Sequence, residues 1–96
     1  MNIEFNKSNN TLNVSLIGRL DTITAPEFES FFAENYKGVG ALVIDCEKLE
    51  YISSAGLRVL LGAQKKTKGA MKLKNVCEIV MEVFELTGFA DILVIE

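Results

Sequence analysis

Segments with the two-residue periodicity of β-strands alternate along this chain with segments of helical periodicity, and this alternation limits the possible folds more than any other feature. Residues 12–16 alternate between apolar and polar side chains, as in a strand with one wetted face. Residues 3–5 show the same spacing, and the polar run 6–10 between the two segments favours a turn. The chain is therefore predicted to begin as an antiparallel hairpin.

The first helix is predicted to start at Thr24. Thr24 is placed to cap free backbone N–H groups, Glu27 completes a capping box, and Pro26 suits a first helical turn. The aromatic residues of 28–36 follow at helical spacing and form one apolar stripe. An aromatic stripe can hold a flat cofactor, but we interpret this one as core packing.

A second helix is predicted from Ser53 or Ser54 to about Thr67. Lysines at its C-terminal end suit the helix dipole, and Gly69 closes it. The residues expected on one side of this helix are Leu57, Leu60, Leu61 and Gln64.

The third helix is predicted after Asn75–Glu78, which resembles a second capping box. Helical spacing places Ile79, Val83 and Leu86 on the inner face, and Gly88 ends the helix. The outer face is expected to carry Glu78, Glu82 and Glu85.

The remaining strands are short apolar segments. The unbroken run Ala41–Ile44 indicates a central strand covered on both faces, and further strands are predicted at Met71–Lys74 and Ile92–Ile95. Residues 45–52 are expected to form a connection. The predicted fold is one α/β domain over residues 1–96, in the order β-β-α-β-α-β-α-β. Its sheet is mostly parallel with a leading antiparallel hairpin, and the helices pack on it.

Composition restricts the partners and the compartment. A net charge of −3 disfavours nucleic acid, and we interpret the lysines of 65–74 as a solvated helix end and outer strand. Cys46 and Cys77 are far apart in the sequence and are expected to be buried thiols in a reducing cytosol. No apolar run approaches the ~20 residues that a membrane helix needs. We expect a cytoplasmic protein that binds no membrane, as a monomer or a weak dimer.

The inventory for catalysis is small. The chain has no histidine, the commonest general base, and no glycine-rich phosphate loop in the right structural context. Asp45, Glu47 and Glu50 are a possible metal-ligand set, which we interpret as a solvated acidic loop. We therefore expect no catalytic residue, metal or cofactor, and a protein that is not an enzyme.

Residues 51–61, Tyr-Ile-Ser-Ser-Ala-Gly-Leu-Arg-Val-Leu-Leu, place two hydroxyls at a helix entrance. A serine there is suited to cap the helix, because it accepts a hydrogen bond from a free backbone N–H. The same free N–H groups and the helix dipole stabilise a phosphate, so the serine is also suited to be a phosphoacceptor. The position alone favours the plain cap and leaves the phosphoacceptor as the alternative.

Four stretches, in order and at matching spacing, resemble the STAS family, the anti-sigma-factor antagonists. They are Gly18-Arg19-Leu20-Asp21 with Thr24-Ala25, then Val43-Ile44-Asp45, then Tyr51–Leu57, and finally Val83–Phe89. The resemblance covers nearly the whole chain. The third stretch resembles the family's switch segment, in which a serine two residues before Gly-Leu is phosphorylated.

The resemblance implies that Ser54 is the phosphoacceptor and that Ser53 stands where the family has aspartate. Arg58 stands where well-studied members frequently have glycine. The implied partners are an anti-sigma factor that is also a serine kinase, and a serine phosphatase; nucleotide and metal belong to these partners. The implied docking surface consists of Asp21, Thr24, Ser53, Ser54, Gly56, Leu57 and Arg58.

The implied mechanism is partner switching in transcription regulation: the unphosphorylated protein binds the anti-sigma factor, and phosphorylation of Ser54 releases it. One alternative is a constitutive STAS subunit of a transporter or signalling complex, in which the switch serine is only a helix cap. A small-molecule sensor or lipid-binding domain has less support, because no set of residues converges on a ligand.

Overall fold

The protein opens with the predicted hairpin. The computed structural model describes residues 1–96, with β1 (Asn2–Ser8) antiparallel to β2 (Thr11–Leu20). The connecting residues Asn9 and Asn10 have φ values of 51° and 61°. Positive φ at both central residues is the mark of a type I′ turn, whose twist matches that of the flanking strands.

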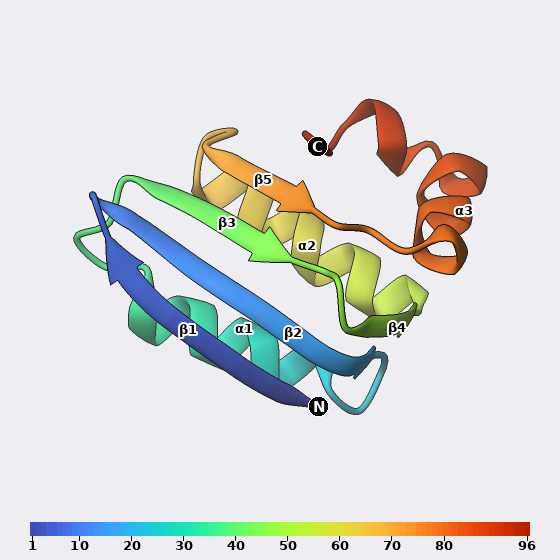
Figure 1. The fold of residues 1–96 in the computed structure, drawn as a ribbon, viewed down its shortest axis with the longest axis horizontal. Coiled ribbons are helices and arrows are strands. Elements are labelled where there is room, and N and C mark those ends of the chain that lie inside the picture. Colours follow the sequence, from blue (N-terminus) through green and yellow to red (C-terminus); the bar gives the residue numbers. More distant parts are fainter.

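Three parallel strands complete a five-stranded sheet in the order β1-β2-β3-β5, with β4 paired to β2 off this path. The strand β3 (Ala41–Asp45) lies between β2 and β5 (Met71–Lys74). The strand β4 (Leu49–Ile52) pairs with the last residues of β2, beyond the end of β3 (Figure 1). The ten-residue β2 therefore runs the full length of the sheet. It pairs with β3 along its first half and with β4 at its end.

Two helices, α1 (Ala25–Asn35) and α2 (Ser54–Lys66), cover one face of the sheet, and the other face is open (Figure 1). Side chains of β2 alternate between buried and partly exposed, as expected for one covered face. The helix α3 (Glu78–Thr87) packs beside β4, followed by the short 3-10 helix η1 (Phe89–Asp91). The predicted α/β class, with a mostly parallel sheet and a leading hairpin, is confirmed.

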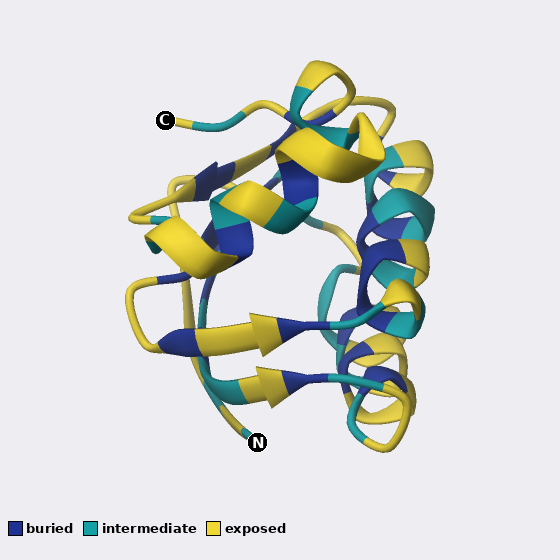
Figure 2. Ribbon diagram, turned by 90° about the vertical axis from the view of Figure 1, so that its right-hand side faces the viewer, coloured by how far each residue is buried: buried dark blue, intermediate teal, exposed yellow.

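The core lies between the sheet and α1 and α2, and extends under α3 (Figure 2). Its largest fully buried side chains are Phe28, Phe84, Leu12, Leu16, Leu20, Leu42, Ile44, Leu49, Ile52, Leu60, Met71 and Leu73. None of the helices has the length and hydropathy to cross a bilayer.

The prediction that residues 45–52 form only a connection is wrong, because β4 occupies their second half. Leu49 and Ile52 are buried and the two residues between them are exposed, so the segment shows no two-residue alternation. A register shift at Gly18 and Arg19 accommodates this irregular strand beside β2.

The predicted last strand at Ile92–Ile95 shrinks to a single parallel bridge between Ile95 and Leu73. Two backbone hydrogen bonds hold it, from Leu73 N to Val94 O at 2.9 Å and from Glu96 N to Leu73 O at 2.8 Å. Because η1 turns the chain until Asp91, few residues remain to run beside β5.

The predicted outer face of α3 is confirmed, since Glu78, Glu82 and Glu85 are exposed, but the predicted inner face is wrong at Ile79 and Leu86. Val80 and Phe84 are buried, whereas Ile79 is 60% and Leu86 85% exposed and Val83 is half-buried. Both sides of this helix carry apolar residues, so periodicity alone does not choose between them.

The predicted capping box of α3 is also wrong. Cys77 occupies the N-cap position without a side-chain cap bond, and Asn75 instead donates its side-chain amide to Asp45 at 3.1 Å. Gly88 ends the helix in the left-handed conformation, as predicted.

The two cysteines differ in burial. Cys46 is buried as expected, and desolvation raises the pKa of its thiol to about 12. Cys77 is only half-buried, and its thiol points to the Leu49 carbonyl at 3.3 Å.

Candidate partner-binding site

Only one of the two serines at the start of α2 caps the helix. Ser53 is the N-cap residue, and its hydroxyl accepts a hydrogen bond from the Gly56 N–H at 3.4 Å. Ser54 is the first helical residue and is exposed, and no hydrogen bond within the protein engages its hydroxyl. Ser54 is therefore free for chemistry that would leave the cap in place.

Gly56 lets the first turn of α2 approach the end of β2. A Cβ added to it would lie 2.6 Å from the Leu20 carbonyl oxygen and 2.7 Å from Cγ1 of Ile52. That carbonyl also accepts a hydrogen bond from Ser53 N at 3.0 Å, which joins the two segments directly. Gly56 and its neighbour Leu57 are both buried, so they shape the site from beneath.

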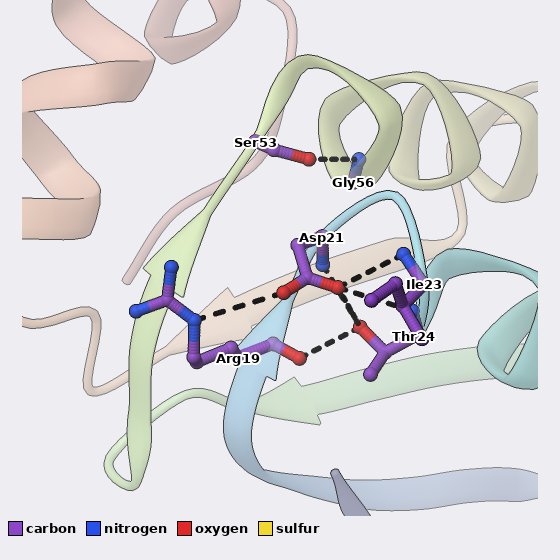
Figure 3. Close-up of polar contacts among 6 residues, drawn as sticks. All are labelled: Arg19, Asp21, Ile23, Thr24, Ser53 and Gly56. Carbon is purple, nitrogen blue, oxygen red and sulfur yellow. Dashed lines mark hydrogen bonds and ion pairs between the residues drawn. The ribbon is translucent and has the colours of Figure 1, made fainter.

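The residues after Leu20 form a tight loop that Asp21 organises (Figure 3). The Asp21 carboxylate accepts backbone hydrogen bonds from Ile23 at 3.0 Å and from Thr24 at 3.1 Å. The Thr24 hydroxyl donates to the Arg19 carbonyl at 2.7 Å and accepts from Asp21 N at 2.8 Å. The prediction that the Thr24 side chain caps α1 is wrong, because its hydroxyl closes this loop instead.

These bonds also set the charge of Asp21. The backbone N–H of Thr24 makes the largest contribution in holding the pKa of the Asp21 carboxyl below its ordinary value, and Ile23, the Thr24 hydroxyl and Arg19 add to it. The carboxylate is thus ionised at neutral pH and already occupied by its own loop. The loop in turn presents Ile23, whose side chain is 84% exposed.

Arg19 makes a cation–π contact and an ion pair beside this loop. The Arg19 guanidinium lies 4.3 Å from the centre of the Tyr51 ring, and its Nε is 3.6 Å from the Asp21 carboxylate. The stacked pair ties β4 to the end of β2 next to the start of α2.

Arg58 is exposed one helical turn after Ser54 and forms no ion pair in the structure. It borders a hollow of about 290 Å³ between the starts of α1 and α2. The hollow is lined by Thr22, Ala25, Pro26, Glu29, Ala55, Arg58 and Val59.

The structure thus brings the predicted site residues to one end of the molecule, from two segments some thirty residues apart in sequence. Ser54 and Arg58 are exposed, Asp21, Thr24 and Ser53 are partly exposed, and Gly56 and Leu57 are buried. Ile23, a large apolar residue exposed in an otherwise polar loop, is not among the residues predicted from the sequence.

The acidic residues considered as metal ligands do not assemble a ligand set, and no three potential ligands of the chain gather at one point. The Asp45 carboxylate instead accepts hydrogen bonds from Glu47 N at 3.0 Å and from the Asn75 amide.

Comparison with known proteins identifies the family, since the profile of the STAS domain matches residues 2–96. The chain belongs to the STAS domain family. It is 29% identical over 96 residues to the anti-sigma-B factor antagonist of Bacillus subtilis, with 97% of this chain and 88% of that protein covered. It is 35% identical over 96 residues to BtrV of Bordetella bronchiseptica, named as a candidate anti-sigma factor antagonist, with 96% and 83% covered.

The fold is shared with a solved structure, the phosphorylated form of the Bacillus cell fate determinant SpoIIAA. The TM-score is 0.74 at 17% identity, and the match covers 99% of this chain and 91% of that one. At this identity the likeness concerns the fold, which agrees with the sheet and helices described above.

Proposed function

We propose that this protein is an anti-sigma factor antagonist that acts by partner switching, with Ser54 as its phosphoacceptor. In its unphosphorylated form it binds an anti-sigma factor that is also a serine kinase, and so frees a sigma factor. Phosphorylation of Ser54 releases it, and a serine phosphatase restores it. The relatives named as antagonists support the general role, and the arrangement of the two serines supports the site.

The observation that carries the proposal is the free, exposed hydroxyl of Ser54 beside a separate cap residue. During transfer, Ser54 Oγ forms a bond to the γ-phosphorus of ATP, the bond from that phosphorus to ADP breaks, and the hydroxyl proton passes to a base of the kinase. No hydrogen bond within the antagonist has to break for this reaction. The antagonist itself supplies no catalytic group in this proposal.

The docking surface in this proposal is the end of the molecule where α2 starts. Ser54 and Arg58 offer direct contacts, and the loop of Asp21 and Thr24 presents Ile23. The Ser53 cap fixes where α2 begins, and Gly56 and Leu57 determine how closely the helix packs against β2.

Phosphorylation at this position is expected to weaken the complex and not the fold. The first residue of a helix tolerates negative charge, because free N–H groups and the dipole stabilise it. In the complex, a dianion at Ser54 must be desolvated against a partner shaped for a hydroxyl. Phosphorylation is therefore expected to lower the affinity for the partner.

The test is to incubate the protein with its cognate anti-sigma factor kinase and ATP and to measure intact mass. We expect one added phosphate, which Ser54→Ala abolishes and Ser53→Asn, which keeps a capping acceptor, largely retains. Phosphate on Ser53 would refute the site. No phosphate with any cognate kinase would leave a constitutive STAS subunit as the better account.

A further inference from the structure

Arg58 is an exposed cation without a carboxylate partner. The two ion pairs of the protein are Arg19 with Asp21 and Lys72 with Glu96, and neither includes Arg58. The exposed side chain makes no hydrogen bond within the protein either. The proposed function uses this arginine only as a docking contact and gives it no role once the neighbouring serine carries a dianion.

The spacing places this arginine within reach of Ser54. Residues four apart on a helix have Cβ atoms about 5–6 Å from one another and lie on one face. The acidic member would be N-terminal to the basic one, which is the favourable order for such pairs. A guanidinium also binds phosphate with two parallel N–H donors, which an ammonium does not.

We propose that Arg58 is the intramolecular partner of the phosphate on Ser54, an inference that rests on the proposed function. In the unphosphorylated protein Arg58 is available to a carboxylate of the anti-sigma factor. After phosphorylation the guanidinium closes on its own phosphoserine. The modification then acts twice, because it adds a dianion to the docking surface and withdraws the surface's exposed cation from the partner.

The other charged groups around this position have the opposite effect on the phosphate. Glu29 of α1 lines the same hollow as Arg58, and Asp21 lies in the loop next to the first turn of α2. Asp21 is paired with Arg19, which also stacks on Tyr51 and is held away from the helix. Removal of Arg58 would therefore leave mainly acidic groups near the phosphate, and these raise the second pKa of a phosphoserine.

The experiment uses full-length protein with phosphoserine incorporated at position 54 during translation, so that no kinase is needed. Phosphorus NMR titration gives the second pKa of the phosphate, ordinarily about 6. We expect Arg58→Gln to raise this pKa by about 0.3–0.5 unit, and Arg58→Lys to raise it less. In 1 M NaCl the difference should shrink, because the charges are exposed.

The matched control is Lys65→Gln, which removes one positive charge from the exposed surface of the same helix. Lys65 lies about 16 Å along the axis from Ser54, beyond the Debye length at ordinary salt, so the pKa should not change. An equal pKa in the native and Arg58→Gln proteins, or equal shifts for Arg58→Gln and Lys65→Gln, would overturn the inference.

This result is independent of the proposed function. If Arg58→Gln shifts the pKa while phosphorylation leaves partner binding unchanged, the pairing stands and partner switching fails. If phosphorylation releases the partner but the pKa does not respond to Arg58, partner switching stands and the pairing fails.

Discussion

Replacement of Gly56 by alanine should destabilise the protein, although alanine is the better helix former. The added Cβ would meet the Leu20 carbonyl oxygen at 2.6 Å, and a backbone atom cannot rotate away. Overpacking of this kind costs roughly 1–3 kcal/mol. Displacement of the carbonyl would also weaken the hydrogen bond that it accepts from Ser53 N, which costs about 1 kcal/mol of stability. Alanine's helix preference returns up to about 1 kcal/mol, so the net loss is about 1–3 kcal/mol.

The same helix provides a matched control at Gly62, where an added Cβ would meet nothing within 4 Å. Gly62→Ala should therefore stabilise the protein by about 0.5–1 kcal/mol, through helix preference alone. The same glycine-to-alanine substitution is thus expected to destabilise the protein at position 56 and to stabilise it at position 62.

Thermal and urea unfolding followed by circular dichroism measure both effects. For a domain of this size, each kcal/mol shifts Tm by about 4–8 °C. If Gly56→Ala proves as stable as Gly62→Ala, then the close approach of α2 to β2 is not as described, and the account of the site loses its support.

Three further predictions concern other parts of the molecule. Phe84→Ala should cost about 3–5 kcal/mol of stability, whereas Leu86→Ala should stay within about 0.5 kcal/mol; similar losses at both positions in urea unfolding would restore the face predicted from sequence. Because burial raises the pKa of Cys46 from 9.0 to about 12, the unfolded state loses this proton first, and stability should fall between pH 9 and 12 by up to about 1.4 kcal/mol per pH unit. A Cys46→Ala variant that retained the same pH slope would contradict this. Asp21→Ala should reduce the hydrogen-exchange protection of the Thr24 amide, and in the native protein that protection should decline as pH falls below 3.8; unchanged exchange would mean that the carboxylate does not hold the loop.

Much of the fold follows from patterns in the sequence, because one face of the sheet is covered and the other is wet. The alternation in β2 reports this arrangement directly, whereas the unbroken apolar run of β3 is typical of a strand covered on both faces, although its side chains alternate between buried and partly exposed. The strand β4 escaped prediction because Leu49 and Ile52 are buried three residues apart, a spacing that occurs on the apolar face of a helix and not in the two-residue alternation of a regular strand.

The helix α3 shows a second limit. Apolar residues on both of its sides satisfy the same periodicity, and the choice between Val80 with Phe84 and Ile79 with Leu86 depends on where β4 lies. Because the sequence does not reveal β4, it does not show which side of α3 packs on that strand.

At the site, the sequence indicates which residues gather but not the contact that each of them makes. Whether Ser53 or Ser54 caps α2 depends on where the helix begins, to within one residue, and this is the least certain part of a sequence pattern. The approach of Gly56 to Leu20 depends on contacts between segments far apart in the chain. The use of Thr24 in the loop and not as a cap likewise requires Asp21 and Arg19 to be in place.

The most direct test of partner switching is a calorimetric titration of the cognate anti-sigma factor with unmodified and Ser54-phosphorylated protein at equal salt. The proposal predicts that phosphorylation weakens binding at least tenfold, or about 1.4 kcal/mol, without a change in the circular dichroism of the antagonist. Equal affinity of the two forms, or tighter binding of the phosphorylated one, would contradict it.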